Sequence, residues 1–303
     1  MPRAVLLLVA LALAGCGPRL LQWGWDEPDQ RDLLRYRSLM ERSPFDGVIL
    51  RLSTLDATGR PDNFSWEAAT RLFPREELAP AVADLKAAAS SRLRHHFLRV
   101  NLNPADGPFD FFDDAAWATL TGNLVAAAQA AREADLAGLL LDPEAYSDPD
   151  PGTGRARYNV FDYARRALPD RPFSAYREEA FRRGVAVVQA LRGAHPEITL
   201  LLAFGLWMDY GPTGPCARFG VAGQPCPWYD PLLHPESRQE QLDPGRFREA
   251  VAAALALTDG YVWIYAEQAR WWTTDPREAN LPEAYAEAVR AARRAAGAAC
   301  REN

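Results

Sequence analysis

The chain carries six short apolar runs, separated for the most part by longer amphipathic segments. The runs have the length of β-strands and the unbroken apolar character of strands that are buried on both faces. They lie at residues 20–25, 47–53, 96–101, 137–141, 198–204 and 260–265. Strands that alternate with helices predict right-handed β-α-β units and a parallel sheet.

The intervening segments repeat apolar residues with the period of an α-helix, as Leu78, Val82 and Leu85 show. Asp113 or Asp114 is a suitable N-cap for the third of these helices. The predicted helices cover residues 30–42, 75–93, 114–134, 174–193, 244–257 and 282–299.

A (β/α)₈ TIM-like barrel is the fold class that this alternation favours. Six units do not close an eight-stranded barrel, so two further strands are expected within the Pro-, Gly- and aromatic-rich residues 206–243, where the barrel is otherwise degenerate or incomplete. An open doubly wound sheet is the alternative. No Gly-x-Gly-x-x-Gly motif or P-loop follows the first strand, which removes the commonest ligands of that fold. Residues 16–303 are predicted to form one domain.

The first residues resemble a bacterial lipoprotein signal peptide. Arg3 precedes an apolar core at residues 4–12, and Leu-Ala-Gly-Cys ends at Cys16. The resemblance implies removal of residues 1–15, acylation of Cys16 (palmitate among the chains) and anchoring in the cell envelope, with the outer membrane favoured over the inner by Gly17. The alternative is a cleaved secretory peptide without lipid. No later run is apolar enough to span a membrane.

Charge and cysteine content narrow the expected ligands and the compartment. The formal net charge of −6 argues against nucleic acid as a partner and suits a neutral ligand better. No protein partner is inferred. Because the cell envelope is oxidising, Cys216 and Cys226 are expected to form a disulfide, and Cys300 is interpreted as an incidental thiol.

The scarcity of lysine and histidine excludes several kinds of catalysis. Lys86 is the single lysine and lies within a predicted outer helix, which argues against Schiff-base and pyridoxal-phosphate chemistry. His95, His96 and His195 fall at the amino-terminal side of the sheet, and only His234 remains for the opposite side. A His-rich metal site or a Ser-His-Asp triad is therefore not expected, and no metal or cofactor site is predicted.

The segment Leu-Ala-Gly-Leu-Leu-Leu-Asp-Pro-Glu-Ala-Tyr at 136–146 ends an apolar strand at Asp142, Glu144 and Tyr146. Reactive groups of parallel α/β folds lie where strands end, so these side chains fall where chemistry is usually located. The alternative is that Asp142 caps a turn before Pro143 and that Glu144 is solvated.

The other predicted strands end in similar residue types. Apolar rings bind the CH faces of sugars, amides and carboxylates bind hydroxyls, and two opposed carboxyls supply glycoside hydrolysis. The predicted substrate-binding residues are Trp25, Asp26, Arg51, Asn101, Asn103, Tyr146, Trp207, Asp209, Tyr265, Arg270, Trp271 and Trp272.

Several of these aromatic and charged residues also have structural interpretations. Trp23 and Trp263 alternate along strands and are expected to be core or helix-facing. Asp26 could be only the N-cap of the helix that begins near residue 30. Arg51 could pair with an acid inside the barrel mouth instead of binding ligand.

Blocks spread over most of the chain resemble a family of uncharacterised secreted bacterial proteins that are regarded as TIM-barrel glycoside hydrolases. The blocks are GWDEPD at 24–29, SPFDGVIL at 43–50, NFSW at 63–66, HFLRVNLNP at 96–104, FDFFDDAAW at 109–117, GLLLDPEAY at 138–146 and YVWIYAEQARWW at 261–272. The resemblance implies a barrel with carbohydrate-directed sites at its carboxyl end, and residues 206–243 depart from the family pattern. Retaining barrel glycosidases place the acid/base after strand four, which Glu144 matches, and the nucleophile after strand seven, whereas Glu267 follows the last predicted strand.

The sequence thus predicts a metal-independent glycoside hydrolase acting on a neutral or weakly charged glycan. Glu144 is the expected general acid/base, with a pKa raised by burial and by Asp142, and Glu267 is the expected nucleophile or base. Asp142 and Glu144 could exchange roles. Alternatives are a non-catalytic carbohydrate-binding lipoprotein and a site where Asp26, Asp142, Glu144 and Glu267 hold a divalent cation.

Overall fold

The computed structural model describes most of the chain, and all structural statements below concern that part. It comprises residues 17–24, 26–56, 58–90, 92–104, 109–144, 160, 161, 163, 171–203, 243–258, 260–266, 270–272 and 282–302, with side chains described as far as residue 297. Within it, no helix has both the length and the hydrophobicity needed to cross a bilayer.

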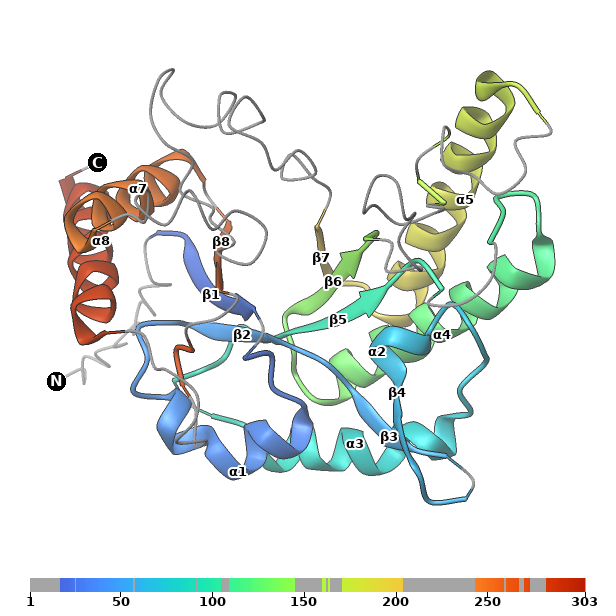
Figure 1. Ribbon diagram of the computed structural model, residues 1–303, viewed down its shortest axis with the longest axis horizontal. Helices are drawn as coiled ribbons and strands as arrows, with labels where there is room; N and C mark the ends of the chain where they lie inside the picture. The colour runs from blue at the N-terminus through green and yellow to red at the C-terminus, as the bar shows by residue number, and fades with distance from the viewer. Residues whose placement is uncertain are drawn as a thin grey trace, which may run out of the picture.

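The core of the described chain is a six-stranded parallel sheet flanked by helices (Figure 1). All six predicted strands are confirmed, with ends that shift by at most three residues. They are β1 (Arg19–Gly24), β2 (Gly47–Leu50), β5 (Phe97–Asn101), β6 (Gly138–Asp142), β7 (Thr199–Leu202) and β8 (Tyr261–Ala266).

The predicted helices are confirmed as well. Asp29 caps α1 through a reciprocal capping box with Asp32, so Asp26 is not that helix's N-cap, and Asp113 caps α4. The helices are α1 (Gln30–Met40), α3 (Arg75–Ala87), α4 (Asp114–Glu133), α5 (Phe173–Ala194), α7 (Pro244–Leu257) and α8 (Glu283–Glu302).

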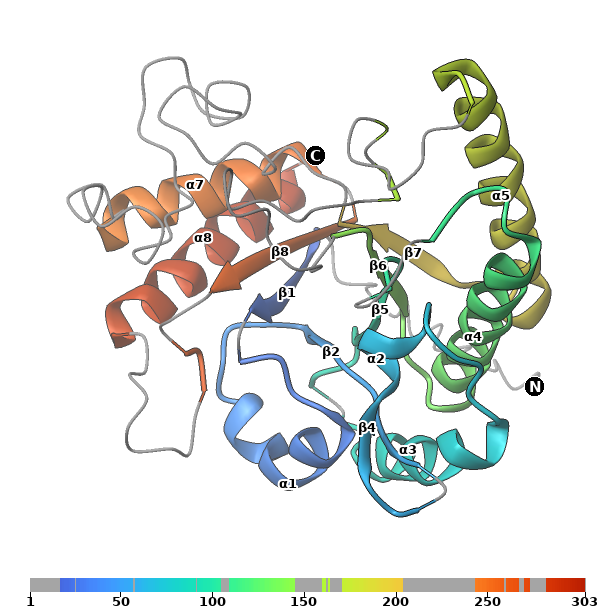
Figure 2. The ribbon, with the colours of Figure 1, turned by 45° about the vertical axis from the view of Figure 1, so that its right-hand side comes forward.

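The strand order is that of a barrel and not of a doubly wound sheet. It runs β7-β6-β5-β2-β1-β8, so the sheet strands from β1 to β7 each lie beside the next one in the chain, and the last strand, β8, pairs in parallel with the first. The arrows of β1 and β8 lie side by side in Figure 2. A doubly wound sheet would instead reverse its order at an internal switch point. Among the described residues the sheet is open between β7 and β8, and residues 204–242, where two further strands were expected, lie outside the described part.

The two faces of the sheet are packed differently. One face buries Leu21, Trp23, Ile49, Phe97 and Leu140 in a cluster of strand residues, which forms the inner side of the curled sheet. The strand residues that alternate with these pack against the helices on the outer side. Trp23 is therefore core, as expected, and it contacts Tyr265 edge to face at 5.1 Å between ring centroids.

A hairpin and a short helix follow β2, and the sequence pattern did not predict them. β2 ends at Leu50 rather than at Ser53, and β3 (Ser53–Leu55) pairs antiparallel with β4 (Pro61–Asn63) before α2 (Phe64–Glu67). Polar side chains hold this insertion. The Gln30 amide exchanges two hydrogen bonds with the Ser53 backbone, at 2.7 and 3.0 Å.

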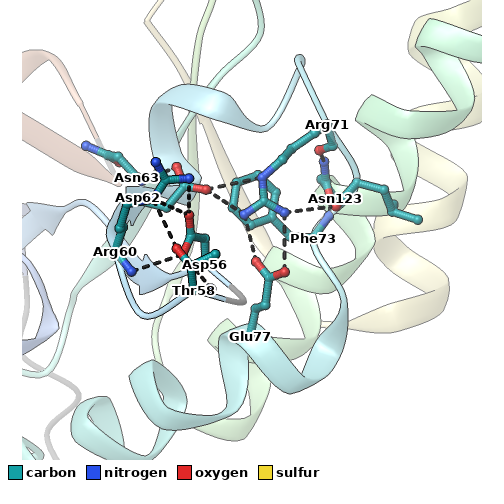
Figure 3. A network of polar contacts seen from close by, with 10 residues as sticks. Asp56, Thr58, Arg60, Asp62, Asn63, Arg71, Phe73, Glu77 and Asn123 are labelled. Carbon is teal, nitrogen blue, oxygen red and sulfur yellow. Dashed lines mark hydrogen bonds and ion pairs between the residues drawn. The ribbon is translucent and has the colours of Figure 1, made fainter.

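A polar network fixes the insertion against α3 and α4 (Figure 3). Arg71 forms ion pairs with Asp62 of β4 and Glu77 of α3, at 2.5 and 2.7 Å, and its guanidinium lies over the Phe73 ring. Asn123 of α4 is fully buried and donates to the carbonyl oxygens of Ala68 and Arg71. These bonds fix residues 61–73, and with them Trp66, in position beside the sheet.

Asp26 joins the end of β1 to the segment that follows β8. Its Oδ2 accepts the backbone N–H of Trp271 at 2.8 Å, and its side chain is buried. Burial raises the pKa of Asp26 to about 6, against the lowering influence of the Trp271 N–H, the Gln22 side chain and Arg270. A carboxylate held here at neutral pH therefore destabilises the fold relative to a neutral group.

Asp26→Asn is expected to stabilise the protein at pH 8 and not at low pH. The folded-state pKa is raised, so the penalty for the charged carboxylate is fully present above pH 6 and disappears as the pH falls below the unfolded value of 3.8. The amide keeps an acceptor for the Trp271 N–H and can donate to Gln22. Thermal unfolding should show a Tm increase of roughly 2–4 °C at pH 8, equivalent to about 1 kcal/mol. This increase should fade as the pH is lowered toward 4.

Asp29→Asn is the matched control because asparagine caps a helix about as well as aspartate. It should change Tm little at either pH. An Asp26→Asn variant whose Tm shift was the same at pH 8 and pH 4 would contradict a buried, charged Asp26.

Candidate active site

A buried ion-pair network lies at the carboxyl end of the inner side of the sheet. Arg99 of β5 forms a bidentate pair with Glu27, at 2.6 and 3.0 Å, and reaches Oδ2 of Asp142 on β6 at 3.4 Å. The side chains are 3%, 9% and 1% exposed, respectively. The Arg99 guanidinium also lies over the Trp66 ring, 4.4 Å from its centroid. Arg99 is thus enclosed by two carboxylates and an indole.

Asp142 uses each of its oxygens for a different contact. While Oδ2 faces Arg99, Oδ1 accepts the backbone N–H of Glu144 at 3.0 Å. Asp142 therefore does cap the turn at Pro143, as the structural interpretation expected, and it also takes part in the ion-pair network. This cap fixes the direction in which the chain leaves β6 and positions Glu144, which is half-buried at the edge of the network.

The network contains more acid than base. Burial raises the pKa of Asp142, and the nearby Glu27 carboxylate acts in the same direction. The Arg99 charge and the Glu144 N–H oppose the rise without abolishing it. One guanidinium faces the two carboxylates of Glu27 and Asp142, and Glu144 follows within two residues. Such a site favours retention of a proton or stabilisation of a positive charge nearby.

The two predicted asparagines have different surroundings. Asn103 uses both ends of its amide, because its Nδ2 donates to the Pro143 carbonyl at 2.5 Å and its Oδ1 accepts the Val160 N–H at 3.1 Å. Asn101 is paired in register with Asp142 across β5 and β6 and is also buried. Within the described part of the chain, its Oδ1 has no hydrogen-bond partner.

Glu27, Arg99 and Trp66 were not predicted as site residues. The signal that could have identified Arg99 is a single charge inside the apolar strand His-Phe-Leu-Arg-Val-Asn, at the strand position that shares a face with Phe97 and Asn101. Arg51, which directly follows β2, holds the same region in place, since it donates to the Glu27 carbonyl at 2.9 Å. A guanidinium nitrogen of Arg51 also lies 3.8 Å from Oδ2 of Asp32 in the first turn of α1. Arg51 therefore does pair with an acid, although the contact is long for an ion pair.

The aromatic residues after β8 pack against protein. The Trp271 ring contacts Phe45 edge to face at 4.9 Å, and Trp272 lies 5.8 Å from Tyr36 of α1. Both contacts belong to the outer, helix-covered side of the sheet. Tyr265 lies on the inner side with Trp23, and the charge of Arg270 acts on Asp26. Trp271 and Trp272 are therefore structural in this arrangement rather than exposed at the inner mouth.

Several predicted residues lie outside the described part of the chain. They are Cys16, Trp25, Tyr146, Trp207, Asp209, Cys216, Cys226 and Glu267. His234 is among these undescribed positions too. Neither the disulfide nor the candidate partner of Glu144 is therefore tested by the structure.

The described part of the site has neither a metal-binding cluster nor a lysine. The described residues contain no group of three or more His, Cys, Asp or Glu side chains arranged to hold a metal ion, and this includes Asp26, Asp142 and Glu144. Lys86 lies on α3, half-exposed, and pairs with Glu133 at 3.2 Å. The chain's single lysine is therefore remote from the inner side of the sheet, which excludes a Schiff-base lysine there.

Comparison with known proteins gives no family. No family model and no curated protein matches the chain. Among solved structures, a crystal structure of a glycoside hydrolase is 12% identical, with a TM-score of 0.42 over 91% of this chain and 99% of the other. A sialic acid aldolase of Ruminococcus gnavus is 10% identical, with a TM-score of 0.31. The match covers 82% of this chain and 61% of the aldolase chain. At such TM-scores these likenesses carry no conclusion about the function.

Proposed function

We propose that this protein is a glycoside hydrolase in which Glu144 is the general acid/base. The observation that supports the proposal is that Asp142 uses both of its oxygens for structural contacts, one of which positions Glu144. One carboxylate oxygen of Asp142 accepts the Glu144 N–H at 3.0 Å, and the other accepts Arg99 at 3.4 Å. Glu144 is thereby held, half-buried, at the carboxyl end of an inward-facing strand, which is the usual location of catalytic groups in α/β barrels.

The charge of the network supports an acid/base role. A general acid needs a carboxyl that keeps its proton near neutral pH, and burial together with neighbouring carboxylates favours this. Glycoside cleavage also develops positive charge on the sugar ring, and the acid-rich mouth stabilises such charge. Arg99 limits the repulsion between Glu27 and Asp142, so that both acids can remain close to Glu144.

A polar acceptor beside the network suits a hydroxylated ligand. Asn101 is 2% exposed, and its Oδ1 has no partner in the described part of the chain. A buried amide oxygen without a donor is costly, and a sugar hydroxyl or a water molecule would satisfy it. Its neighbour in the register is Asp142, the residue that positions Glu144.

We further propose that Glu267 is the second carboxyl and that Cys16 is lipidated. Glu267 follows Ala266, the last residue of β8, and in the sheet order β8 is separated from β6 by β1, β2 and β5. In a curled sheet, strands this far apart in order face each other across the mouth, as an acid and its partner must. Because β8 pairs with β1, Glu267 follows the last strand. Glu267 thus does not follow strand seven of a complete eight-stranded barrel. The residues after that strand would lie within residues 204–242.

Glu144→Gln tests the acid/base role directly. The purified full chain is assayed for reducing-sugar release on a panel of neutral polysaccharides and for hydrolysis of aryl glycosides. The variant is expected to lose roughly 10²–10⁴-fold in kcat on substrates with poor leaving groups, because protonation of the leaving oxygen is lost. Aryl glycosides with acidic phenols, which need little protonation, should lose much less.

Glu133→Gln is the control, because Glu133 lies on α4 and pairs with Arg75 and Lys86 at the outer surface. It should leave kcat unchanged. Glycan binding without turnover in the parent protein would contradict the enzyme and would favour a carbohydrate-binding protein. Equal loss on all leaving groups would contradict the role of Glu144 as the acid.

Asp142→Asn separates positioning from charge. The amide oxygen can still accept the Glu144 N–H, while the negative charge beside Glu144 is removed. The alkaline limb of the profile of kcat/KM against pH is expected to move to lower pH, because a neighbouring carboxylate that favours protonated Glu144 is gone. An unchanged alkaline limb would contradict electrostatic coupling of the two side chains.

A further inference from the structure

A basic cleft lies at the amino-terminal edge of the sheet, opposite the candidate active site. It has a volume of about 430 Å³, and its lining includes Asp46 and the four arginines Arg92, Arg290, Arg293 and Arg294. The arginines come from α8 and from the loop before β5, and Pro44, Phe45 and Asp46 come from the loop between α1 and β2. The sequence pattern did not predict a site on this face.

The arginines are held in place by the loop between α1 and β2. Arg293 donates to the Pro44 carbonyl and to Asp46 Oδ1, both at 2.6 Å, and Arg92 donates to the Ser43 carbonyl at 2.5 Å. Arg290 pairs with Glu283 and donates to the Arg42 carbonyl. A guanidinium has five N–H donors, and these bonds use one or two of them, so each arginine retains donors for a ligand.

The cleft is cationic although the chain as a whole carries a formal charge of −6. Among the described residues that line it, Asp46 is the one acid, and that carboxylate already accepts Arg293 and the Leu20 N–H. The lining keeps a net positive charge even when Glu283 is counted. Arg19 and Arg94 lie on the same edge, where both act electrostatically on His95. Clustered guanidiniums on one face bind phosphate groups through paired N–H donors.

The position of the cleft relative to Cys16 indicates which phosphate it meets. Asp46 accepts the Leu20 N–H at 2.9 Å and donates its own N–H to the Leu20 carbonyl at 2.8 Å, so the cleft adjoins the start of β1. Leu20 is four residues after Cys16. A chain of four residues spans at most about 14 Å, so lipidation of Cys16 would bring the basic edge to the headgroups of the surrounding leaflet.

We propose that this cleft binds the phosphate headgroup of an anionic phospholipid in the leaflet that holds the anchor. The proposal rests on lipidation of Cys16 for its location and is independent of the catalytic role of Glu144. Binding at this edge directs the carboxyl end of the sheet, with Glu144, away from the membrane. The lipid anchor sets the distance of the domain from the membrane, and the arginines set its orientation.

The test measures binding of short-chain phosphatidylglycerol to the purified full chain below the micelle concentration, with short-chain phosphatidylcholine and inorganic phosphate as comparison probes. Phosphatidylglycerol is expected to bind at least tenfold more tightly than either. Arg294→Glu and Arg290→Glu should each weaken binding roughly fivefold or more, as expected for loss of one basic residue near an anionic headgroup. Raising the salt concentration from about 50 to about 300 mM should weaken the binding of phosphatidylglycerol to the parent protein as well.

Arg177→Glu on α5 is the matched control, with the same change of charge at an exposed position outside the cleft, and it should bind phosphatidylglycerol like the parent. Equal affinity for phosphatidylcholine, or equal effects of Arg294→Glu and Arg177→Glu, would overturn the proposal. Tighter binding of inorganic phosphate would assign the cleft to a free anion instead of a lipid. Glycan hydrolysis, measured on the same variants, should be unchanged by Arg294→Glu, so failure of the lipid site and failure of the enzyme are distinguishable.

Discussion

Arg99 is buried between two carboxylates inside the parallel sheet, and the surrounding structure at the carboxyl edge is arranged around that charge. A buried guanidinium has to be paired and hydrogen-bonded to be tolerated. Glu27 supplies two bonds from the end of β1, Asp142 supplies a third contact from β6, and Trp66 covers the planar face from α2. Loss of one partner from such a group typically costs about 3–5 kcal/mol, so these three segments are held together.

Other residues, which do not contact Arg99, hold its partners Trp66 and Glu27 in position. Trp66 is held in place because Arg71 links β4 to α3 and Asn123 of α4 binds the carbonyl oxygens that follow α2. Glu27 lies on a segment whose backbone receives Arg51, and Asp26 beside it receives the Trp271 N–H. The hairpin, the first strand and the segment after the last strand thus converge on the region where Glu144 leaves β6.

The opposite edge of the sheet has a different character. Arginines of α8 and of the loop before β5 bind carbonyl oxygens and the carboxylates of Asp46 and Glu283 there, and the described part of the chain enters the sheet at the same edge. An acid-rich carboxyl edge and a basic amino edge divide the two proposed tasks, hydrolysis and orientation on a membrane, between opposite ends of the same strands. Helices that run back from one edge to the other make this separation a direct consequence of the β-α-β order.

Much of the fold follows from the sequence alone. Six apolar runs and six amphipathic segments identify the strands and helices, because burial on both faces and the helical period leave strong local patterns. The same patterns locate Asp142 and Glu144 at a strand end. The hairpin β3–β4 escaped prediction because its strands have three residues each and are held by side chains from distant helices. Only the tertiary structure decided that β8 pairs with β1, that Arg99 lies between Glu27 and Asp142, and that Trp271 and Trp272 pack under the outer helices. These outcomes depend on pairings between residues that are 43 to 245 positions apart in the chain, and local periodicity contains no information about such pairings.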